Sequence, residues 1–417
     1  MLRYCRLCLV LAVLAAGGLQ AAEARWPAFD GDLSGLLRLD ALGDAPPLTW
    51  HTHVKPTAGG PPQIDLELSA RGLGLHARVT LPPGEAPGTW QIADGTIDLA
   101  VWLPIALARA GQAALPPDLA VTGTLRLAGE GTWRNAEVSG SLTAALDGAT
   151  AGSAAQNWSA SGVALAAVIA LTNNLPAVRS LRLDVDTLQV ASLTARRIVA
   201  EAAGAAGGRL DLRRAELEMF GGRVALAPFT FDPAMPAVDT TADLTGVALG
   251  ELAALAPQAV AEAHGQVAGR VAVRWSAQLG TEPGAGALRV SVDTPATVRL
   301  AATPGFLTQR VPARLGLIGG SFGPLSRWLS VENPAYDTLR RIELGELPLA
   351  VDRLEVKLYP DGPDGAISAR VELSGHPAEA NSAVGGVSFV VNVAGPLSQV
   401  LRVGLKQNAS IQINSAR

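Results

Sequence analysis

The feature that most constrains this chain is the recurrence of apolar residues at every second position. The pattern begins at Ile64, Leu66 and Leu68 and continues from Leu73 to Leu81. A period of two places the apolar side chains on one face of a β-strand, so the chain is predicted to be mainly β. The alternation returns at Leu181, Leu183 and Val185, at Val224 and Leu226, at Val271 and Val273, at Leu288, Val290 and Val292, and at Leu354, Val356 and Leu358.

Turn-forming residues separate these runs. They include Pro82-Pro83-Gly84, Gly207-Gly208, Pro283-Gly284 and the stretch Asp361–Gly365. The chain contains 45 Gly and 28 Pro residues, which long helices tolerate poorly. The sequence therefore predicts short strands joined in repeated meanders.

Two segments are predicted to be helical. Leu249–Ala263 has the spacing of a short amphipathic helix in spite of Pro257, and Asn333-Pro334 opens a helix that runs on through Ile342. Two interpretations of these helices stay open. Either they plug or cap a groove in the sheet, or they cover an ordinary core.

The first residues have the organisation of an export signal. Two arginines precede an uncharged run from Leu7 to Leu19, and small residues suited to cleavage after Ala21 or Ala24 follow. The run is too short for a spanning helix, so residues 1–24 are predicted to be a signal peptide or a short anchor. Both cysteines, Cys5 and Cys8, lie in this segment.

Composition excludes some classes of protein. Apolar residues make up 48 % of the chain, too many for a disordered protein, and a net charge of -4 without a basic tract argues against nucleic-acid binding. A Gly-, Ala- and Ser-rich stretch predicts a boundary near residue 160. It divides a β-rich region at 25–160 from a second region at 161–417.

One motif favours an enzyme. Gly319–Gly323 fits the G-x-S-x-G turn that exposes the serine of a hydrolase, here Ser321, and Asp352 or Asp364 and His376 follow in the matching order. The hydrolase fold, however, needs parallel strands alternating with helices, which this chain lacks upstream of Ser321. No catalytic residue is predicted, and a serine esterase remains an alternative.

No metal ion or cofactor is predicted. His51 and His53 share one strand face, but the neighbouring sequence supplies no ligand cluster, so a surface pair is the preferred interpretation. A phosphate-cradling glycine loop followed by lysine is also missing from the sequence.

The alternation itself has two interpretations. In one, the apolar face packs into a sandwich or barrel core. In the other, a curved sheet leaves that face open as a trough for lipid chains. Burying hydrocarbon there is favourable by about 0.8 kcal/mol per methylene group. The pattern alone does not decide between them.

The second half of the chain, from about residue 205 to 417, resembles the YdbH-like proteins of the Gram-negative envelope, which are related to the AsmA-like and TamB group. The resemblance is carried by Met219–Leu226 with Phe229–Pro233, Leu244–Leu255, Gly265–Val273, Asn333–Leu339, Gly375–Pro377, Val387–Val393 and the region of Leu397–Leu401.

This resemblance implies an elongated, curved antiparallel sheet, a β-taco, that moves phospholipids between the inner and outer membranes. It also implies a non-catalytic protein in the periplasm or cell envelope, with an N-terminal inner-membrane anchor. An older family label, dicarboxylate transport, keeps a small-acid carrier among the alternatives, beside a β-rich scaffold of envelope assembly.

The residues expected to line such a groove are Leu288, Val290, Val292, Leu354, Val356, Leu358, Val371, Leu373, Phe389 and Val391. The resemblance further implies a small outer-membrane lipoprotein that adds strands to an exposed C-terminal edge. That edge is expected to contain Leu401, Val403, Leu405, Ile411 and Ile413.

Overall fold

The structure of the chain is a computed structural model. It describes residues 30–38, 45–57, 60–81, 86–109, 118–134, 137–191, 193–254, 257–276, 280–291, 294–316, 330–360, 367–379, 382–394 and 411–414.

The described residues form a mainly β protein. Twenty-three strands belong to one antiparallel sheet that does not close, strands β20 and β21 form a separate pair, and three short α-helices are described. The predicted class, an antiparallel β protein with a few short helices, is confirmed. The described chain falls into two compact units that divide near residue 215, with residues 230–234 in the first. The boundary predicted near residue 160 falls within a strand.

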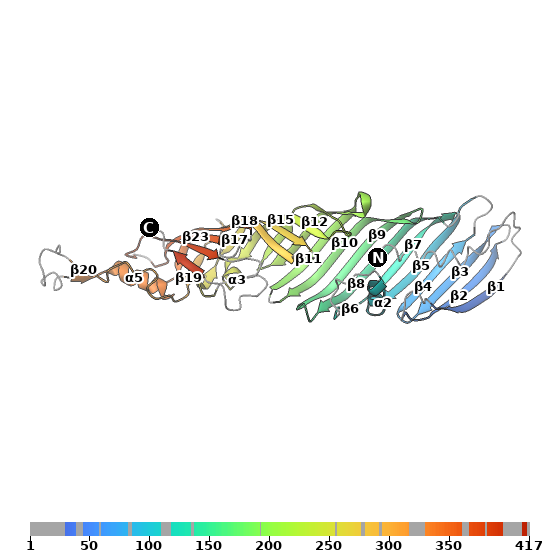
Figure 1. Cartoon of the computed structure of the whole chain (residues 1–417), viewed down its shortest axis with the longest axis horizontal. Helices are drawn as coiled ribbons and strands as arrows, with labels where there is room; N and C mark the ends of the chain where they lie inside the picture. Colours follow the sequence, from blue (N-terminus) through green and yellow to red (C-terminus); the bar gives the residue numbers. More distant parts are fainter. Residues whose placement is uncertain are drawn as a thin grey trace. The chain divides into compact units, whose positions relative to one another are not determined.

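Unit 1 is a meander in which each long strand pairs with the next one along the chain (Figure 1). Its one interruption is a helix between β5 and β6, after which β5 pairs with β7 and β6 with β8. The elements are β1 (Gly31–Leu37), β2 (Leu48–Thr57), β3 (Gly60–Ala70), β4 (Leu73–Thr80), β5 (Gly88–Asp98), α2 (Leu99–Arg109), β6 (Ala120–Thr122), β7 (Thr124–Arg134), β8 (Glu137–Ser153), β9 (Trp158–Thr172), β10 (Leu175–Val190) and β11 (Leu193–Gly204).

Tight turns hold the register of this meander. The turn between β9 and β10 consists of Asn173 and Asn174, both with positive φ. Two such residues in succession match the right-handed twist of the flanking strands, and asparagine tolerates this conformation better than most residues. The side chain of Asn174 also accepts a hydrogen bond from the backbone N–H of Val138, which ties this turn to β8.

Unit 2 is built from shorter strands. β15 pairs with β13 and β17, and the ladder continues through β18, β22, β23, β24 and β25. η2 (Ala206–Gly208) still belongs to unit 1. The elements that follow it along the chain are β12 (Leu210–Met219), β13 (Gly222–Leu226), β14 (Phe229–Phe231), β15 (Ala237–Ala248), α3 (Leu249–Ala253), β16 (Val260–His264), β17 (Gln266–Ser276), β18 (Gly280–Val290), β19 (Thr297–Leu300), β20 (Arg314–Gly316), β21 (Ser330–Glu332), α5 (Pro334–Glu343), β22 (Leu349–Leu358), β23 (Ile367–Pro377), β24 (Val387–Ala394) and β25 (Ile411–Asn414).

One predicted helix is confirmed and the other is largely wrong. α5 begins at Pro334, and the side chain of Asn333 caps it by accepting a hydrogen bond from the N–H of Ala335 at 3.1 Å. The helix predicted over Leu249–Ala263 stops at Ala253, and its last residues form β16, which pairs with β19. Pro257, which lies in a turn, explains the stop because proline cannot continue the helical hydrogen bonding.

The core of unit 2 lies between its sheet and α5. Ile342 of α5 and Leu349 of β22 are fully buried there, in one cluster with Leu354, Leu373 and Phe389. The segment after β19 packs on the same cluster through Phe306, whose ring meets Phe389 edge-on at 6.3 Å between centroids. α5 and this segment therefore cover part of the apolar face of unit 2.

A buried carboxylate fixes that cover. Glu343 is 3 % exposed and accepts hydrogen bonds from the backbone N–H groups of Gly305, Leu307 and Thr308 and from the Thr308 hydroxyl, at 2.8 to 3.1 Å. Burial raises the pKa of Glu343, but these donors outweigh it, so the pKa lies below its usual value. The backbone and hydroxyl donors of residues 305–308 thus stabilise the charged form of Glu343, and the carboxylate in turn fixes this loop against α5.

We predict that Glu343→Ala destabilises the protein by about 2–4 kcal/mol, because it leaves several donors around the former carboxylate without an acceptor. The measurement is the midpoint of urea unfolding. Glu346→Ala, an exposed position just beyond the same helix, is the control and should leave the midpoint unchanged. Equal midpoints for the two variants would contradict the anchoring role.

Candidate functional site

A long apolar row crosses the sheet of unit 1. Directly opposed residues of antiparallel strands point to the same face, so the register identifies side chains that form a continuous surface. Following the partners from β4 to β11 gives seven apolar residues in succession, named here the long row: Leu73, Ile97, Leu125, Leu146, Leu165, Leu183 and Ala200.

The neighbouring rows on the same face are also apolar. Two residues along each strand, the partners from β2 to β11 are Trp50, Leu68, Leu75, Gly95, Leu127, Ala144, Ala167, Leu181 and Ala202. The opposite face differs, since the row between these two contains Thr96, Arg126, Ala145, Ala166, Arg182 and Glu201. The sheet of unit 1 thus separates an apolar face from a polar one.

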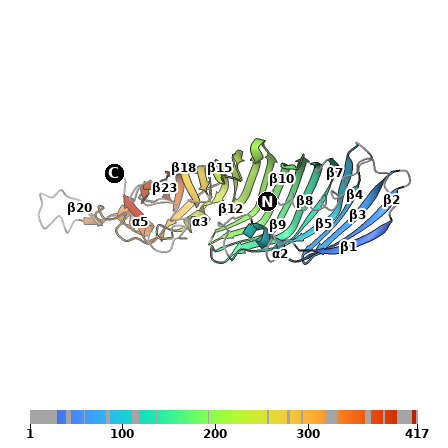
Figure 2. The ribbon, with the colours of Figure 1, turned by 45° about the vertical axis from the view of Figure 1, so that its right-hand side comes forward.

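The apolar face of unit 1 is only partly covered. Every residue of the long row is half-buried, including the large side chains Leu125, Leu146 and Leu165. Residues in the centre of a closed sandwich would be fully buried by the second sheet. Within the part of unit 1 that the structure describes, the only α-helix is α2, which packs against β5 and β6 (Figure 2). The described part of unit 1 therefore leaves this row without a second layer that buries it fully.

Tryptophans lie flat across glycines at one margin of this face. A Cβ atom on Gly131 or Gly140 would come within 2.8 Å of the Trp90 ring, and one on Gly88 would meet Trp133 at 2.5 Å. Trp90 donates its indole N–H to the backbone oxygen of Ser139 at 3.3 Å. Because these glycines have no side chain, the indole rings lie close to the backbone of the sheet. This margin is therefore apolar without side chains that project far from the sheet.

Unit 2, considered by itself, also has an apolar face, which consists of two rows. Leu354, Leu373 and Phe389 are opposed on β22, β23 and β24 and are all buried under α5, and we name them the closed row. The next row, named the open row, is half-buried apart from Leu288 at 8 % and consists of Leu288, Val356, Val371 and Val391.

The register places nine of the ten predicted lining residues on one face of unit 2. They are the members of the closed and open rows together with Val290 and Leu358. Val292 lies outside the described residues. Protein packs directly on the closed row, whereas the open row is less covered. Whether lipid contacts these residues stays a prediction.

The other face of unit 2 carries paired charges. Glu355 is buried beneath Arg353 at 2.8 Å and Arg289 at 3.2 Å, and these hydrogen bonds, that of Arg353 first, lower the pKa of its carboxyl group. The side chains next to the open row, at Arg289, Glu355 and Glu372, are therefore charged and point away from it. The two faces differ as sharply as in unit 1.

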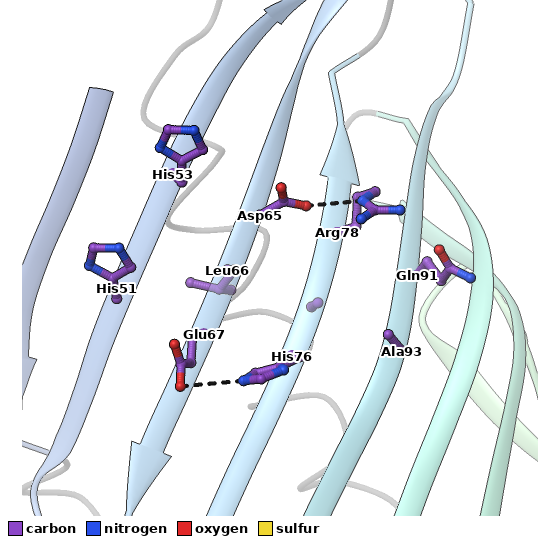
Figure 3. Close-up of a pocket in the computed structure, with 10 residues that line it drawn as sticks. His51, His53, Asp65, Leu66, Glu67, His76, Arg78, Gln91 and Ala93 are labelled. Carbon is purple, nitrogen blue, oxygen red and sulfur yellow. Dashed lines mark hydrogen bonds and ion pairs between the residues drawn. The ribbon is translucent and has the colours of Figure 1, made fainter. Parts of the chain in front are cut away.

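Histidines and carboxylates surround a shallow hollow of about 320 Å³ on the polar face of β2 to β5 (Figure 3). Asp32 contacts His53 at 2.8 Å and His51 at 3.4 Å, and Glu67 contacts His76 at 3.3 Å. The sequence around His51 and His53 supplies no ligand cluster, but β1 brings the carboxylate of Asp32 beside both of them. No cluster suited to a metal ion occurs among the described residues.

All five histidines of the chain pair with a carboxylate in this way, including His264 with Glu262 and His376 with Asp352. The last pair is the one that the esterase alternative requires, at 3.0 Å, but both side chains are more than half exposed. Ser321 and Asp364 lie outside the described residues. The Asp352–His376 contact therefore resembles the other surface pairs of this protein.

Only part of the predicted partner edge can be placed. Leu401, Val403 and Leu405 lie outside the described residues, while Ile411 and Ile413 belong to β25, which pairs with β24. The N-terminal segment predicted to be a signal also lies outside them. No helix of the described residues is long and apolar enough to cross a bilayer.

The chain matches the family described as "YdbH-like: Intermembrane phospholipid transport protein YdbH" over residues 14–285, well over half of its length. It belongs to the YdbH-like family. The resemblance noted in the sequence is confirmed, although the match covers unit 1 and the start of unit 2 rather than residues 205–417. Searches of curated proteins and of solved structures each found no match.

The range that matches the YdbH-like family contains apolar residues that the alternation in the sequence does not identify as one surface. The long row lies entirely within residues 14–285. Alternation at Leu181 and Leu183 indicated a strand there, but only the register shows that Leu183 stands beside Leu165 and Leu146. The signal for this alignment in the sequence is the Asn173-Asn174 pair, which marks the turn between β9 and β10 and so sets which of their residues are opposed.

The polar face of unit 1 gives a test by pH. Lys55, Arg78 and Gln63 all donate hydrogen bonds to Asp65, at 2.9, 3.0 and 3.1 Å. These donors, Lys55 first, lower the pKa of Asp65 from 3.8 to about 2. A depressed carboxyl pKa stabilises the folded state above pH 3.8, and that contribution is lost as the pH falls towards 2.

We predict that Asp65→Asn lowers the free energy of unfolding by about 1 kcal/mol at neutral pH, with the difference shrinking below about pH 4. Urea unfolding of both proteins between pH 7 and pH 3 measures it. Asp94→Asn, at an exposed position of the same face, is the control and should change stability little at any pH. A difference for Asp65→Asn that does not vary with pH would refute the assignment.

Proposed function

We propose that this protein carries phospholipids by holding their acyl chains against the apolar face of its sheet, with the headgroups left in water. The observation that supports the proposal most is the long row, seven opposed apolar residues that are all half-buried. Membership of a family described as intermembrane phospholipid transport agrees with this cargo.

The dimensions of the long row suit acyl chains. Strands lie about 4.8 Å apart, so a row across seven strands extends about 30 Å. The hydrocarbon core of a bilayer is also about 30 Å thick and contains two layers of chains. Each chain placed along the row would remove methylene groups from water, which is favourable by about 0.8 kcal/mol per group.

The composition of the face suits movement as well as binding. Leucine, valine and alanine offer no hydrogen bonds or charges that would fix a lipid at one position. The charged side chains, such as Arg126 and Arg182, are on the opposite face. A chain bound by dispersion and hydrophobic contact alone meets similar surroundings at successive strands, which lowers the barrier to sliding.

In unit 2 we propose the open row and Val290 as the lining residues. The closed row and α5 then form the hydrophobic core that stabilises the sheet of unit 2. The remaining predicted residues, Leu358 and Val292, belong to the same proposal. In this arrangement the protein performs no covalent chemistry.

We further propose a place in the cell envelope, in the periplasm, with the predicted N-terminal segment as signal or inner-membrane anchor. Ile411 and Ile413, with Leu401, Val403 and Leu405, are proposed as the edge to which a small outer-membrane lipoprotein adds strands. Extended edges recruit partners by backbone hydrogen bonding, and the pairing of β25 with β24 supports a strand at this position.

We predict that Leu165→Asp reduces the phospholipid that copurifies with the gently extracted protein by at least fivefold. An acyl chain bound along the long row would have to remove the carboxylate from water, which is unfavourable. Mass spectrometry of the extracted lipids measures it. Ala166→Asp puts the same charge on the exposed polar face and should keep the normal load. Circular dichroism verifies that both variants fold, and equal loads in folded variants would refute the groove.

A parallel pair tests unit 2. Val356→Asp in the open row should lower lipid loading, and so should Val290→Asp, whereas Ser388→Asp on the opposite, exposed face should not. Wild-type protein that contains no phospholipid under gentle extraction would instead favour a scaffold of envelope assembly. A small organic acid in place of lipid would favour the small-acid carrier.

A further inference from the structure

The segment after β19 and helix α5 are fastened to each other at both ends of the helix. Residues 303–313 together with α5 and its capping residue Asn333 are named here the cover. At the C-terminal end of α5, Thr303 donates its backbone N–H to the backbone oxygen of Glu343 at 2.8 Å, beside the donors that the Glu343 carboxylate accepts. At the N-terminal end, the side-chain amide of Asn333 donates to the backbone oxygen of Pro312 at 2.9 Å. The cover is therefore a single hydrogen-bonded piece.

The contacts between the cover and the rest of unit 2 are mainly apolar. Ile342, Phe306 and Leu339 belong to or pack on the buried cluster that contains the closed row. Among the described residues, the one polar contact from the cover to the rest of unit 2, apart from its two chain connections, is the ion pair of Arg341 with Glu379 at 2.8 Å. Hydrophobic contact is non-directional, so it holds the cover in place without the directional hydrogen bonds of a strand ladder.

The two chain connections of the cover lie side by side. The chain enters the cover after Leu300, where β19 ends, and leaves it through Gly345, before β22. Gly345 has a φ of +71°, and a Cβ atom there would come within 2.6 Å of the backbone oxygen of Leu300. The cover is thus attached along one edge, and a few residues at the ends of elements can absorb a hinge rotation.

The apolar face of unit 2 continues beneath the cover. Leu354, Leu373 and Phe389 of the closed row each lie two positions along a strand from a member of the open row, so both rows point to the same face. The open row is proposed above to contact acyl chains. The closed row offers the same kind of surface, and Phe306 and Ile342 of the cover take the place that hydrocarbon would have there.

We propose that the cover is a lid over a further acyl-chain site, the closed row, and that it lifts about the edge at Leu300 and Gly345 when an acyl chain enters from the open row. The proposal rests on the function proposed above and extends it to the closed row. Lifting breaks the exposed Arg341–Glu379 ion pair, which contributes little to stability, but none of the hydrogen bonds inside the cover. An acyl chain that replaces the side chains of the cover buries the closed row again, which offsets the exposure of apolar surface.

The experiment bridges the cover to the rest of unit 2 in the full-length protein. In a background with Cys5→Ser and Cys8→Ser, Arg341→Cys and Glu379→Cys are joined by a short bis-maleimide. The two replaced side chains are 38 % and 51 % exposed, so the substitutions should leave the unfolding midpoint unchanged. The matched control is the same double-cysteine protein with both thiols blocked by N-ethylmaleimide.

Both forms are loaded with phosphatidylcholine that carries a diazirine in one acyl chain and are then illuminated. Peptide mass spectrometry locates the lipid adducts on β22, β23 and β24. We expect adducts on both rows in the blocked protein. The bridge should reduce the adducts on the closed row at least threefold, because the lid cannot lift, and should leave those on the open row unchanged.

Equal yields of closed-row adducts in the bridged and the blocked protein would overturn the lid. Adducts confined to the open row of the blocked protein would overturn it as well, but would agree with the proposed function of the open row. If neither row formed adducts, both proposals for unit 2 would be wrong. The two proposals therefore fail in distinguishable ways.

Discussion

The cross-strand register of the antiparallel ladder is the constraint on which the rest of this structure depends. Because opposed residues share a face, a shift of one position in any strand would move Leu146 or Leu165 from the apolar face to the polar one. The tight turns prevent this shift in unit 1, and the Asn173–Asn174 turn does so with two residues in a conformation that few side chains accept. The alignment of apolar residues over seven strands thus depends on the turn and register of each strand pair. The function proposed for the face is only as continuous as that alignment.

The two units solve the problem of an apolar face in different ways. Unit 2 covers part of its face with α5 and the segment around Phe306, and the carboxylate of Glu343 holds this cover by accepting four hydrogen bonds. Unit 1 leaves its long row half-buried, and its single described α-helix, α2, packs against β5 and β6. A protein that needed only stability would bury both faces, since uncovered leucine lowers the hydrophobic contribution to folding. The difference between the units is therefore informative about function.

Much of the fold could be predicted from the sequence, because alternation fixes strands and the Asn333-Pro334 pair fixes the start of α5. The family could be recognised too, although the matched range lies mostly before the segments that suggested it. What could not be predicted is which strands stand side by side. That depends on turns and on bulges such as the one between Val178 and Ser180, which change the register without a strong sequence signal. For the same reason the long row could not be predicted. The helix expected over Leu249–Ala263 ends early for another reason, because Pro257 cannot continue the helical hydrogen bonding. α2 was not predicted because Pro104 and its uniform apolarity hide the usual helical period.

The simple connectivity of unit 1 has a consequence for how such a protein is made and how it varies. Nearly every strand finds its partner in the strand that came just before it, so pairing requires only short loops to close and can proceed in the order in which the chain is delivered. Inserting or deleting one whole hairpin would leave the parity of all other strands intact. The length of the sheet can therefore change by two strands at a time, while one face stays apolar and the other stays polar.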